Sequence, residues 1–312
     1  MEVLMDIDKI SISETTICVG TFDGLHKGHM KVINRTIEKA KELGTKSLIF
    51  TFWLHPQEII FPKKKIEYLN VLEEKIERFT STGIDYLVVY PFNKTFAQLS
   101  SKEFIKSWLL DRLNMRFLII GHDHQFGKKR EGSYENVLNC AKTFNFGVEQ
   151  IEQHTIGSEI VSSTNIRHLI KEGRIDLANQ LLGYDYFITG TVVRGKSIGH
   201  KIGFPTANVA THSQKILPKD GVYCVEVFYK DEFYQGMGNF GFNPTIDNSP
   251  NFKIEIHLFN FEHNIYDQQI SISLKHRLRS EKKFNSIEAL KTQLEQDRVQ
   301  AIQYFNTNAI KA

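Results

Sequence analysis

The fold of this chain is decided by the stretch Gly20-Thr21-Phe22-Asp23-Gly24-Leu25-His26-Lys27-Gly28-His29. It follows an apolar, strand-like run at residues 16–19 and leads into a segment with the apolar spacing of an amphipathic helix, which ends near Gly44. Glycines let the backbone approach a ligand closely, and the start of a helix offers N–H groups to an anion. His26 and His29 add imidazole donors for the same anion. The stretch therefore predicts a strand–loop–helix unit that binds a triphosphate, called the cradle below.

Two other interpretations of the histidine pair are open when it is taken alone. It could be a strand-to-helix turn with two solvated histidines, or part of a zinc site. Zinc is disfavoured because no further cysteine, histidine or carboxylate lies nearby at ligand spacing. Three glycines and an aspartate within the same ten residues favour the phosphate cradle over the solvated turn.

The cradle resembles the His-x-Gly-His signature of the nucleotidyltransferase superfamily, whose members transfer an AMP or CMP group from a nucleoside triphosphate. The resemblance implies that His26 and His29 are catalytic and bind phosphates in the transition state. It also implies ATP contacts from the rest of the cradle, at Gly20, Phe22, Asp23, Gly24 and Gly28.

Composition places broad limits on function. A chain of 312 residues is long enough for two domains, and its formal charge of +3 does not demand a nucleic acid partner. The first residues lack the pattern of a secretory signal, and no apolar run approaches about 18 residues, so no membrane association is expected. The cysteines Cys18, Cys140 and Cys224 are few and widely spaced, as in a reducing compartment. We expect a cytoplasmic protein whose partners are small molecules, and a homo-oligomer stays open.

The first part of the chain, residues 1–183, alternates short apolar runs with helical patterns. Strands are predicted at residues 47–52, 86–90 and 117–120, and helices at 72–80, 101–110 and 134–144, the middle helix with a capping box of Ser100 and Glu103. This alternation is typical of a doubly wound, Rossmann-like α/β domain with a parallel sheet. Ligands of such sheets bind at the carboxyl ends of the strands, where the cradle would lie.

The second part, residues 184–312, has a different pattern. Strands separated by Gly, Pro, Asn and Asp are predicted at residues 186–193, 222–229, 233–237, 252–258 and 270–278, and a helix at 287–305. This order predicts an antiparallel β-barrel with a terminal helix packed on it.

Two further segments of the first part contain polar groups suited to phosphates or to a flat acceptor. Residues 161–167 place Ser163 and Thr164 at a helix start and Arg167 in its first turn, as in an ordinary capped helix or in a clamp for departing pyrophosphate. Residues 121–132 form a glycine-bounded basic loop, which suits either solvent or a phosphorylated aromatic acceptor. His55 follows another strand end and could reach the same crevice.

The order of these motifs resembles the FMN adenylyltransferase module of the prokaryotic bifunctional riboflavin kinase/FAD synthetases. The resemblance implies flavin contacts from His55, Asp123 and Phe126. Trp53-Leu54 and His124-Gln125 depart from the usual pattern on this flavin side.

Residues 190–197 fit the P-loop formula, from Gly190 to Lys196-Ser197, but they are not interpreted as a P-loop. The formula requires a helix from Lys-Ser onward, and the two glycines and the proline in residues 198–205 prevent one.

The same segment is better read as a glycine-rich flap before Pro205-Thr206-Ala207-Asn208. In extended chain Thr206 and Asn208 point to one side, where their oxygens suit Mg²⁺. The flap glycines and the Pro-Thr-Ala-Asn segment resemble the riboflavin kinase family. This resemblance implies phosphate contacts at Gly195, Gly199 and Gly203, a general base at Glu255, and flavin contacts at Arg279 and Phe284. A carboxylate on an alternating strand is otherwise usually a solvated outward residue.

The predicted protein is a bifunctional enzyme that uses ATP and Mg²⁺ to convert riboflavin to FMN and then FMN to FAD. Two alternatives are weighed against it. One is a nucleotidyltransferase for pantetheine phosphate, a nicotinamide nucleotide or glycerol phosphate, which would not need the barrel. The other is a flavin-binding regulatory or storage protein with decayed sites, which the retained His26, His29, Arg167, Thr206, Asn208 and Glu255 argue against.

Overall fold

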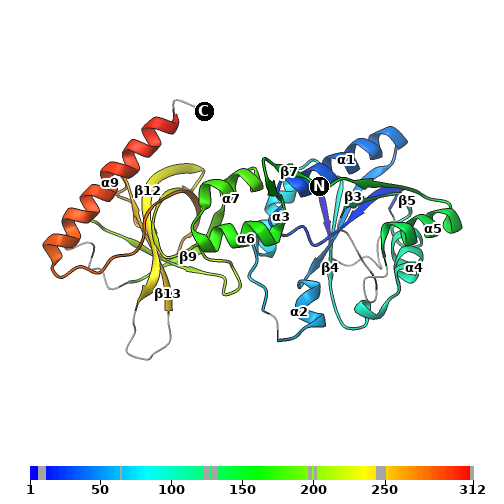
Figure 1. Ribbon diagram of the computed structural model, residues 1–312, viewed down its shortest axis with the longest axis horizontal. Helices are drawn as coiled ribbons and strands as arrows, with labels where there is room; N and C mark the ends of the chain where they lie inside the picture. The colour runs from blue at the N-terminus through cyan, green and yellow to red at the C-terminus, as the bar shows by residue number, and fades with distance from the viewer. Residues whose placement is uncertain are drawn as a thin grey trace. The chain divides into compact units, whose positions relative to one another are not determined.

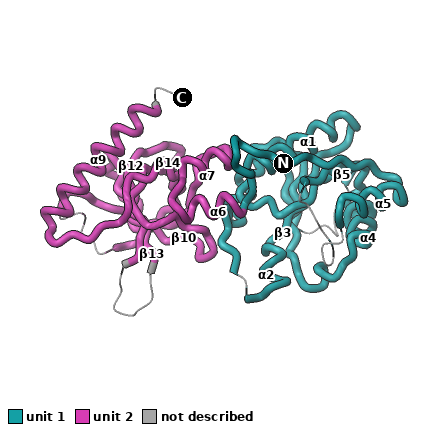
Figure 2. Tube along the Cα trace, viewed as in Figure 1, with its two compact units in different colours: residues 1–163 teal, residues 164–312 magenta. Residues whose placement is uncertain are grey.

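A computed structural model describes residues 1–5, 12–63, 65–122, 127, 132–195, 199, 202–243 and 251–309. The chain forms two compact units, unit 1 at residues 1–163 and unit 2 at residues 164–312 (Figure 2). The units are separated between residues 163 and 164 by the contacts that each part makes in the folded chain. The predicted boundary at residues 183/184 concerns which pieces fold independently, and it stays a prediction.

Unit 1 is built on a six-stranded parallel sheet with the strand order β1-β4-β3-β2-β5-β6 (Figure 1). Its strands are β1 (Glu2–Leu4), β2 (Thr15–Val19), β3 (Lys46–Trp53), β4 (Tyr86–Pro91), β5 (Met115–Gly121) and β6 (Gly147–Ile151). The strands predicted at residues 47–52, 86–90 and 117–120 are confirmed as β3, β4 and β5, and the strand-like run at residues 16–19 forms β2. The edge strands β1 and β6 were not predicted, because each is short and carries little of the apolar alternation that marks a core strand.

Helices cover both faces of this sheet. Successive strand residues point to opposite sides, and apolar residues on both sides are buried under helices. Ile17 and Val19 of β2 lie in one apolar core with α4 (Ser101–Phe104), its wider continuation η2 (Ile105–Leu110) and α5 (Tyr134–Phe144). Cys18 lies in the other core with Ile33 of α1 (Lys27–Leu43) and Phe79 of α3 (Leu72–Thr80). The predicted capping box of Ser100 and Glu103 is present. The shorter elements of unit 1 are α2 (Pro56–Ile60), η1 (Phe96–Gln98), β7 (Thr155–Ile156) and β8 (Glu159–Ile160).

The sheet order brings three of the predicted ligand loops to one edge. Strand β2 pairs with β3 on one side and with β5 on the other, and all three are parallel. Their carboxyl ends therefore lie next to each other, followed by the cradle, by His55 and by the loop after Gly121. The chain changes direction across the sheet at β2, which is where doubly wound sheets bind ligands.

Unit 2 is a closed six-stranded antiparallel barrel with helices packed on it. The barrel order is β10-β13-β12-β11-β14-β9, and pairing of β9 with β10 closes the ring. Its strands are β9 (Phe187–Val193), β10 (Ala207–Thr211), β11 (Gly221–Tyr229), β12 (Glu232–Asn243), β13 (Asn251–Leu258) and β14 (Gln269–Arg279). The helices are α6 (Ser163–Glu172), α7 (Ile175–Leu182) and α9 (Ile287–Ala309). The predicted barrel and terminal helix are confirmed.

Two helices that precede the barrel in sequence belong to its unit. Asp176 of α7 accepts from the His276 ring of β14 at 3.0 Å, and the Lys219 N–H donates to the Ile170 carbonyl of α6 at 3.1 Å. On another side, Ala301 and Phe305 of α9 pack against Cys224 of β11. None of the helices in the described ranges is long and apolar enough to cross a bilayer.

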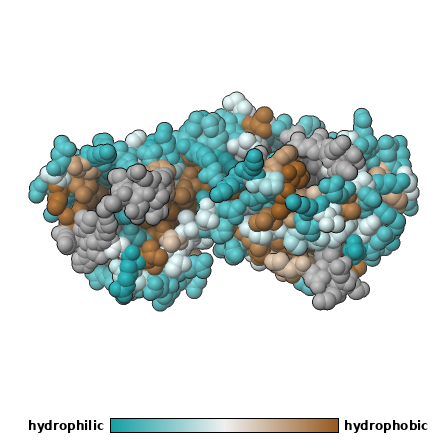
Figure 3. Space-filling model, turned by 90° about the horizontal axis from the view of Figure 1, so that it is seen from below, coloured by the Kyte–Doolittle hydropathy of each residue, from teal (hydrophilic) through white to brown (hydrophobic). Residues whose placement is uncertain are grey.

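Figure 3 shows one face of the molecule, on which apolar side chains gather in patches on a largely hydrophilic surface. Large apolar side chains that are exposed include Phe61, Phe233, Val299 and Ile302.

Candidate active sites

The backbone of the cradle is held in an unusual conformation. Phe22, Gly24 and Leu25 have φ angles of 46°, 87° and 31°, all in the left-handed region, which only glycine adopts freely. The buried Asp23 stabilises the turn, since its two carboxylate oxygens accept from the Leu69 and Asn70 N–H groups at 3.1 and 3.0 Å. Both oxygens of the Asp23 carboxylate therefore accept from backbone N–H groups. In this arrangement Asp23 holds the shape of the cradle backbone.

The two cradle histidines form a stacked pair. Their ring centroids are 3.6 Å apart, with an interplanar angle of 15°. His26 is the N-cap of α1, and its Nδ1 accepts from the His29 N–H at 3.2 Å. A neutral imidazole whose Nδ1 accepts has its proton on Nε2, so His26 offers a ligand one donor rather than two. A Cβ atom on Gly28 would lie 3.2 Å from the His26 ring, so glycine also makes room for this side chain.

Ser163 joins the second predicted clamp to the cradle. Its hydroxyl, at the start of α6, donates to the Asp23 carbonyl oxygen at 2.8 Å, across 140 residues of sequence. Thr164 is the second residue of α6, whereas Arg167 is the fifth and begins the second turn rather than lying in the first turn, where the sequence predicts it.

The flavin side of unit 1 is described only in part. His55 is the N-cap of α2, where its Nδ1 accepts from the Gln57 N–H at 3.1 Å. Its backbone N–H donates to the Tyr68 hydroxyl at 2.9 Å, which holds the segment after β3. Asp123 and Phe126 lie outside the described residues.

In the barrel, the predicted base and a predicted metal ligand are direct neighbours. Asn208 of β10 is the register partner of Glu255 on β13, and Glu255 is also the partner of Asn239 on β12. Partners in antiparallel strands point to the same side of the sheet. Ile254 and Ile256, which flank Glu255, are buried inside the barrel, so Glu255 and its two amide neighbours point outward. Asn239 carries no signal in the sequence, because its pairing with Glu255 follows only from the strand register.

His257 fastens the segment that carries the other predicted metal ligand. It lies two residues after Glu255 on the same strand face, and its Nδ1 is 2.8 Å from the Pro205 carbonyl oxygen, next to Thr206. Burial lowers the pKa of His257, which favours a neutral ring that donates its Nδ1–H to this carbonyl. The strand of Glu255 thereby holds the start of the Thr206–Asn208 segment in place.

The flap glycines are required by close contacts rather than by a P-loop. A Cβ atom on Gly195 would lie 2.0 Å from the Asn208 amide, and one on Gly199 would lie 2.2 Å from the Phe204 carbonyl oxygen. Gly203 has a φ of 83°. Gly190 lies within β9 and pairs with Thr211 and Ile270, which supports rejection of the P-loop reading.

Arg279 forms a buried ion pair with α9. Its guanidinium donates to both carboxylate oxygens of Asp297, with Nε–Oδ1 2.8 Å and Nη2–Oδ2 2.7 Å, and its Nη1 donates to the Ser280 carbonyl. The Phe284 ring centroid lies 5.9 Å from the Arg279 Cζ. The guanidinium fixes the end of β14 to α9 beside Phe284, and this orders the region to which the sequence assigned flavin contacts.

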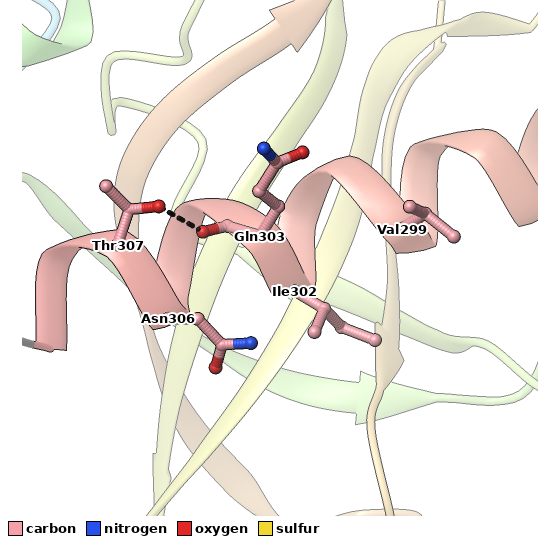
Figure 4. A pocket seen from close by; sticks show the side chains of 5 residues that line it. All are labelled: Val299, Ile302, Gln303, Asn306 and Thr307. Carbon is pink, nitrogen blue, oxygen red and sulfur yellow. Dashed lines mark hydrogen bonds between the residues drawn. The ribbon is translucent and has the colours of Figure 1, made fainter.

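A separate surface hollow of about 500 Å³ lies on α9, lined by Val299, Ile302, Gln303, Asn306 and Thr307 (Figure 4). The Thr307 hydroxyl donates to the Gln303 carbonyl within the helix. The hollow includes none of the predicted site residues and offers no acid or base.

A doubly wound domain with a His-x-Gly-His cradle is followed by a barrel in which Asn208 lies beside the Glu255 carboxylate. This combination is typical of enzymes that transfer nucleotidyl and phosphoryl groups at two sites. Family models match both parts, FAD synthetase over residues 8–165 and riboflavin kinase over residues 182–305. The chain therefore belongs to the family of bifunctional riboflavin kinase/FMN adenylyltransferases, and it is an enzyme of FMN and FAD biosynthesis.

Curated relatives match this chain along nearly their whole length. The chain is 37% identical to the bifunctional riboflavin kinase/FMN adenylyltransferase of Haemophilus influenzae, covering 93% of this chain and 94% of the relative. For the Listeria monocytogenes enzyme the identity is 35%, covering 96% and 93%. A solved structure from Streptococcus pneumoniae, described as a macrolide-efflux protein, has a TM-score of 0.87 at 27% identity, covering 95% of this chain and 96% of that one. The riboflavin kinase match excludes the single-activity nucleotidyltransferases weighed above.

Proposed function

We propose that the two activities use two separate sets of residues, one around the cradle and one in the barrel. The barrel phosphorylates riboflavin to FMN, and the cradle then binds a second ATP and transfers its AMP group to FMN. The observation that carries this proposal is the register pair of Asn208 and Glu255, the residues proposed as a metal ligand and as the general base.

In the kinase step, Glu255 accepts the proton of the riboflavin 5′-hydroxyl, and that oxygen attacks the γ-phosphorus of ATP. The O–P bond to the β-phosphate breaks and ADP leaves. Positioning and charge neutralisation provide most of the catalysis in such transfers. Glu255 is partly exposed on the outer face of the barrel, so substrate has access to it.

The donor set around Glu255 fits Mg²⁺. Thr206 and Asn208 present a hydroxyl and an amide oxygen, and Mg²⁺ binds few protein oxygens together with phosphates and water. Thr206 is held through Pro205 by His257, and the Asn208 amide rests against Gly195. When bound, the ion would neutralise phosphate charge.

In the adenylyl step, a phosphate oxygen of FMN attacks the α-phosphorus of ATP, and the bond to the β-phosphate breaks. His26 and His29 donate to phosphate oxygens, which gain charge as the transition state forms. Ser163, Thr164 and Arg167 hold the departing pyrophosphate. The Ser163 bond to the Asp23 carbonyl supports the role of Ser163, since it holds this side chain against the cradle. His55, Asp123 and Phe126 are proposed to contact the flavin.

The compartment is proposed to be the cytoplasm. Cys18, Cys140 and Cys224 are free and buried, which fits a reducing environment.

The decisive experiment incubates the purified protein with riboflavin, ATP and Mg²⁺ and separates the flavins by chromatography. FMN should appear first and FAD afterwards, and pyrophosphate should form in proportion to FAD. A protein that binds flavin but makes neither product would favour a regulatory or storage role.

A further inference from the structure

A buried lysine lies beneath the cradle. Lys75 of α3 is only 2% exposed, and its Nζ donates to the Thr21 carbonyl oxygen at 2.9 Å. The Thr51 hydroxyl, at the end of β3, donates to the same oxygen at 3.2 Å. Two donors from different elements thus fix one carbonyl at the start of the cradle.

Fixing this carbonyl also fixes the direction of the next N–H group. The Thr21–Phe22 peptide is not among the cis bonds of the described chain. In a trans peptide the C=O and the N–H point in opposite directions. Because the Thr21 oxygen points inward to Lys75 and Thr51, the Phe22 N–H points in the opposite direction, away from both side chains.

The conformation at Phe22 needs such support. A φ of 46° is costly for an aromatic residue and persists only where surrounding contacts impose it. The Phe22 ring packs against His29 at 5.2 Å and Phe79 at 5.8 Å, between ring centroids. The ring contacts fix the side chain, and Lys75 with Thr51 fixes the peptide plane.

The surroundings of Lys75 are mostly neutral. The Trp53 ring centroid is 5.7 Å from Nζ, and Thr21 and Thr51 are uncharged. Asp23 is the carboxylate that acts on it among the described residues, and burial lowers the pKa of Lys75 to about 8 despite this partner. Burial of a lysine ammonium costs free energy, and Lys75 does not lie at the surface, where lysines usually form ion pairs.

We propose that Lys75 is a positioning residue for adenylyl transfer, which holds the Thr21 carbonyl so that the Phe22 N–H is aimed at the phosphates of ATP. The inference rests on the proposed role of the cradle in binding ATP. It adds a residue that does not contact the ligand and that no sequence motif singled out.

The test replaces Lys75 with methionine. Methionine has about the length of the lysine side chain and an apolar stem, but it lacks the ammonium group that donates to the Thr21 carbonyl. Adenylyl transfer from ATP to supplied FMN is measured well below the melting temperature, with separate KM values for ATP and FMN. We expect KM for ATP to rise and kcat to fall, so that kcat/KM for ATP drops roughly 10- to 100-fold, below the 10²–10³-fold of a deleted oxyanion donor. KM for FMN should not change.

A purely structural role would lower the fraction of active enzyme and hence kcat, with both KM values unchanged, and that result would overturn the proposal. Thr51→Val serves as a second variant that keeps the lysine, in case Lys75→Met does not fold. It should raise KM for ATP in the same direction by a few-fold. An unchanged KM for ATP in Thr51→Val, with Lys75→Met unfolded, would also overturn it.

Two controls separate this inference from the function on which it rests. Lys39→Met removes an ion-pairing lysine of α1, bound to Glu42, and should leave both activities unchanged. Riboflavin phosphorylation by unit 2 should be unchanged in all three variants. If His29→Ala keeps full adenylyl transfer, the cradle function fails. If His29→Ala is inactive while Lys75→Met has parental KM and kcat, only the role of Lys75 fails.

Discussion

Asn208 and Glu255 lie directly opposite each other on adjacent strands of the barrel, although 47 positions separate their numbers in the chain. The pairing links the strand that closes the barrel, β10, to the strand that presents the carboxylate, β13. A shift of this register by one residue would turn one of the two side chains to the barrel interior. The kinase site is therefore tied to correct closure of the barrel.

Glu255→Gln should slow riboflavin phosphorylation by about 10²–10⁴-fold, the usual contribution of a general base. The amide keeps the size and hydrogen-bonding capacity of the side chain but cannot accept the hydroxyl proton. Phosphorylation is measured by flavin chromatography, and adenylyl transfer to supplied FMN should be nearly unchanged. Glu262→Gln, an exposed glutamate of the same unit, is the matched control. A rate within a few-fold of the parent would leave Glu255 as an ordinary strand residue.

His29→Ala should have the opposite effect on the two activities. Loss of a phosphate donor is expected to slow FAD formation roughly 10²–10³-fold, by analogy with oxyanion-hole deletions. Riboflavin should still become FMN, so FMN should accumulate in the coupled reaction. His154→Ala, in the same unit but outside the cradle, should keep FAD formation at the parental rate. Parental FAD formation by His29→Ala would refute the phosphate role.

Asp297→Ala should destabilise unit 2. The Asp297 side chain is fully buried and that of its partner Arg279 is 14% exposed, so removal of the carboxylate leaves a guanidinium without its partner. Breaking a buried pair costs about 3–5 kcal/mol, which lowers the melting temperature of a unit this size by roughly 6–20 °C. Calorimetry gives the shift. Glu295→Gln breaks the exposed pair with Arg298 on the same helix and should change stability by under about 1 kcal/mol. Equal effects of the two variants would contradict the burial argument.

Unit 1 should gain stability from Lys75 as pH rises. The pKa of Lys75 is lowered from 10.5 to about 8 in the folded chain, so between these values the unfolded state binds a proton that the folded state does not. Stability rises with pH under that condition, by at most about 3 kcal/mol for this group. Both tryptophans, Trp53 and Trp108, lie in unit 1, so their fluorescence follows its unfolding by urea.

The measurement compares the wild type with Lys75→Met at pH 7 and pH 10, because other groups also titrate in this range. The free energy of unfolding of the wild type should rise relative to that of the variant. A difference that is constant across this range would show that Lys75 keeps an ordinary pKa.

Cleavage at Gly183–Tyr184 should give two pieces that fold separately. Residues 184–312 contain all six barrel strands, α9 and the proposed kinase residues, so this piece should phosphorylate riboflavin. A longer piece, residues 164–312, should be more stable because it keeps α6 and α7 with their bonds to Lys219 and His276. Circular dichroism distinguishes the outcomes. An unfolded 184–312 piece beside a folded 164–312 piece would move the boundary to the start of α6.

The sequence predicts both architectures because the strands that form the cores are strongly apolar or regularly alternating. Residues 16–19 and 47–52 became β2 and β3, and the change of pattern near residue 184 marked the barrel. The edge strand β1 and helix α7 lacked such signals. Short elements like these are stabilised mainly by neighbours that only the folded chain supplies.

Individual residues of the site were predictable where local motifs hold them, as at His26 and His29. Lys75 and Asn239 were not, since their importance depends on long-range contacts, with Thr21 across 54 residues and with Glu255 through strand register. Arg279 was assigned to the flavin, and its bond to Asp297 appears only when α9 is placed on β14.

The bond between Ser163 and the Asp23 carbonyl has a consequence for synthesis of the chain. Ser163, a partner of the cradle, leaves the ribosome well after the cradle itself, because it lies 140 residues further along the chain than Asp23. At about 5–20 residues per second, translation reaches that partner roughly 7–28 s later. During this interval the growing chain already contains His26 and His29 but cannot complete the cradle. A nascent chain halted before residue 163 should therefore bind ATP poorly, and one released just beyond α6 should bind it.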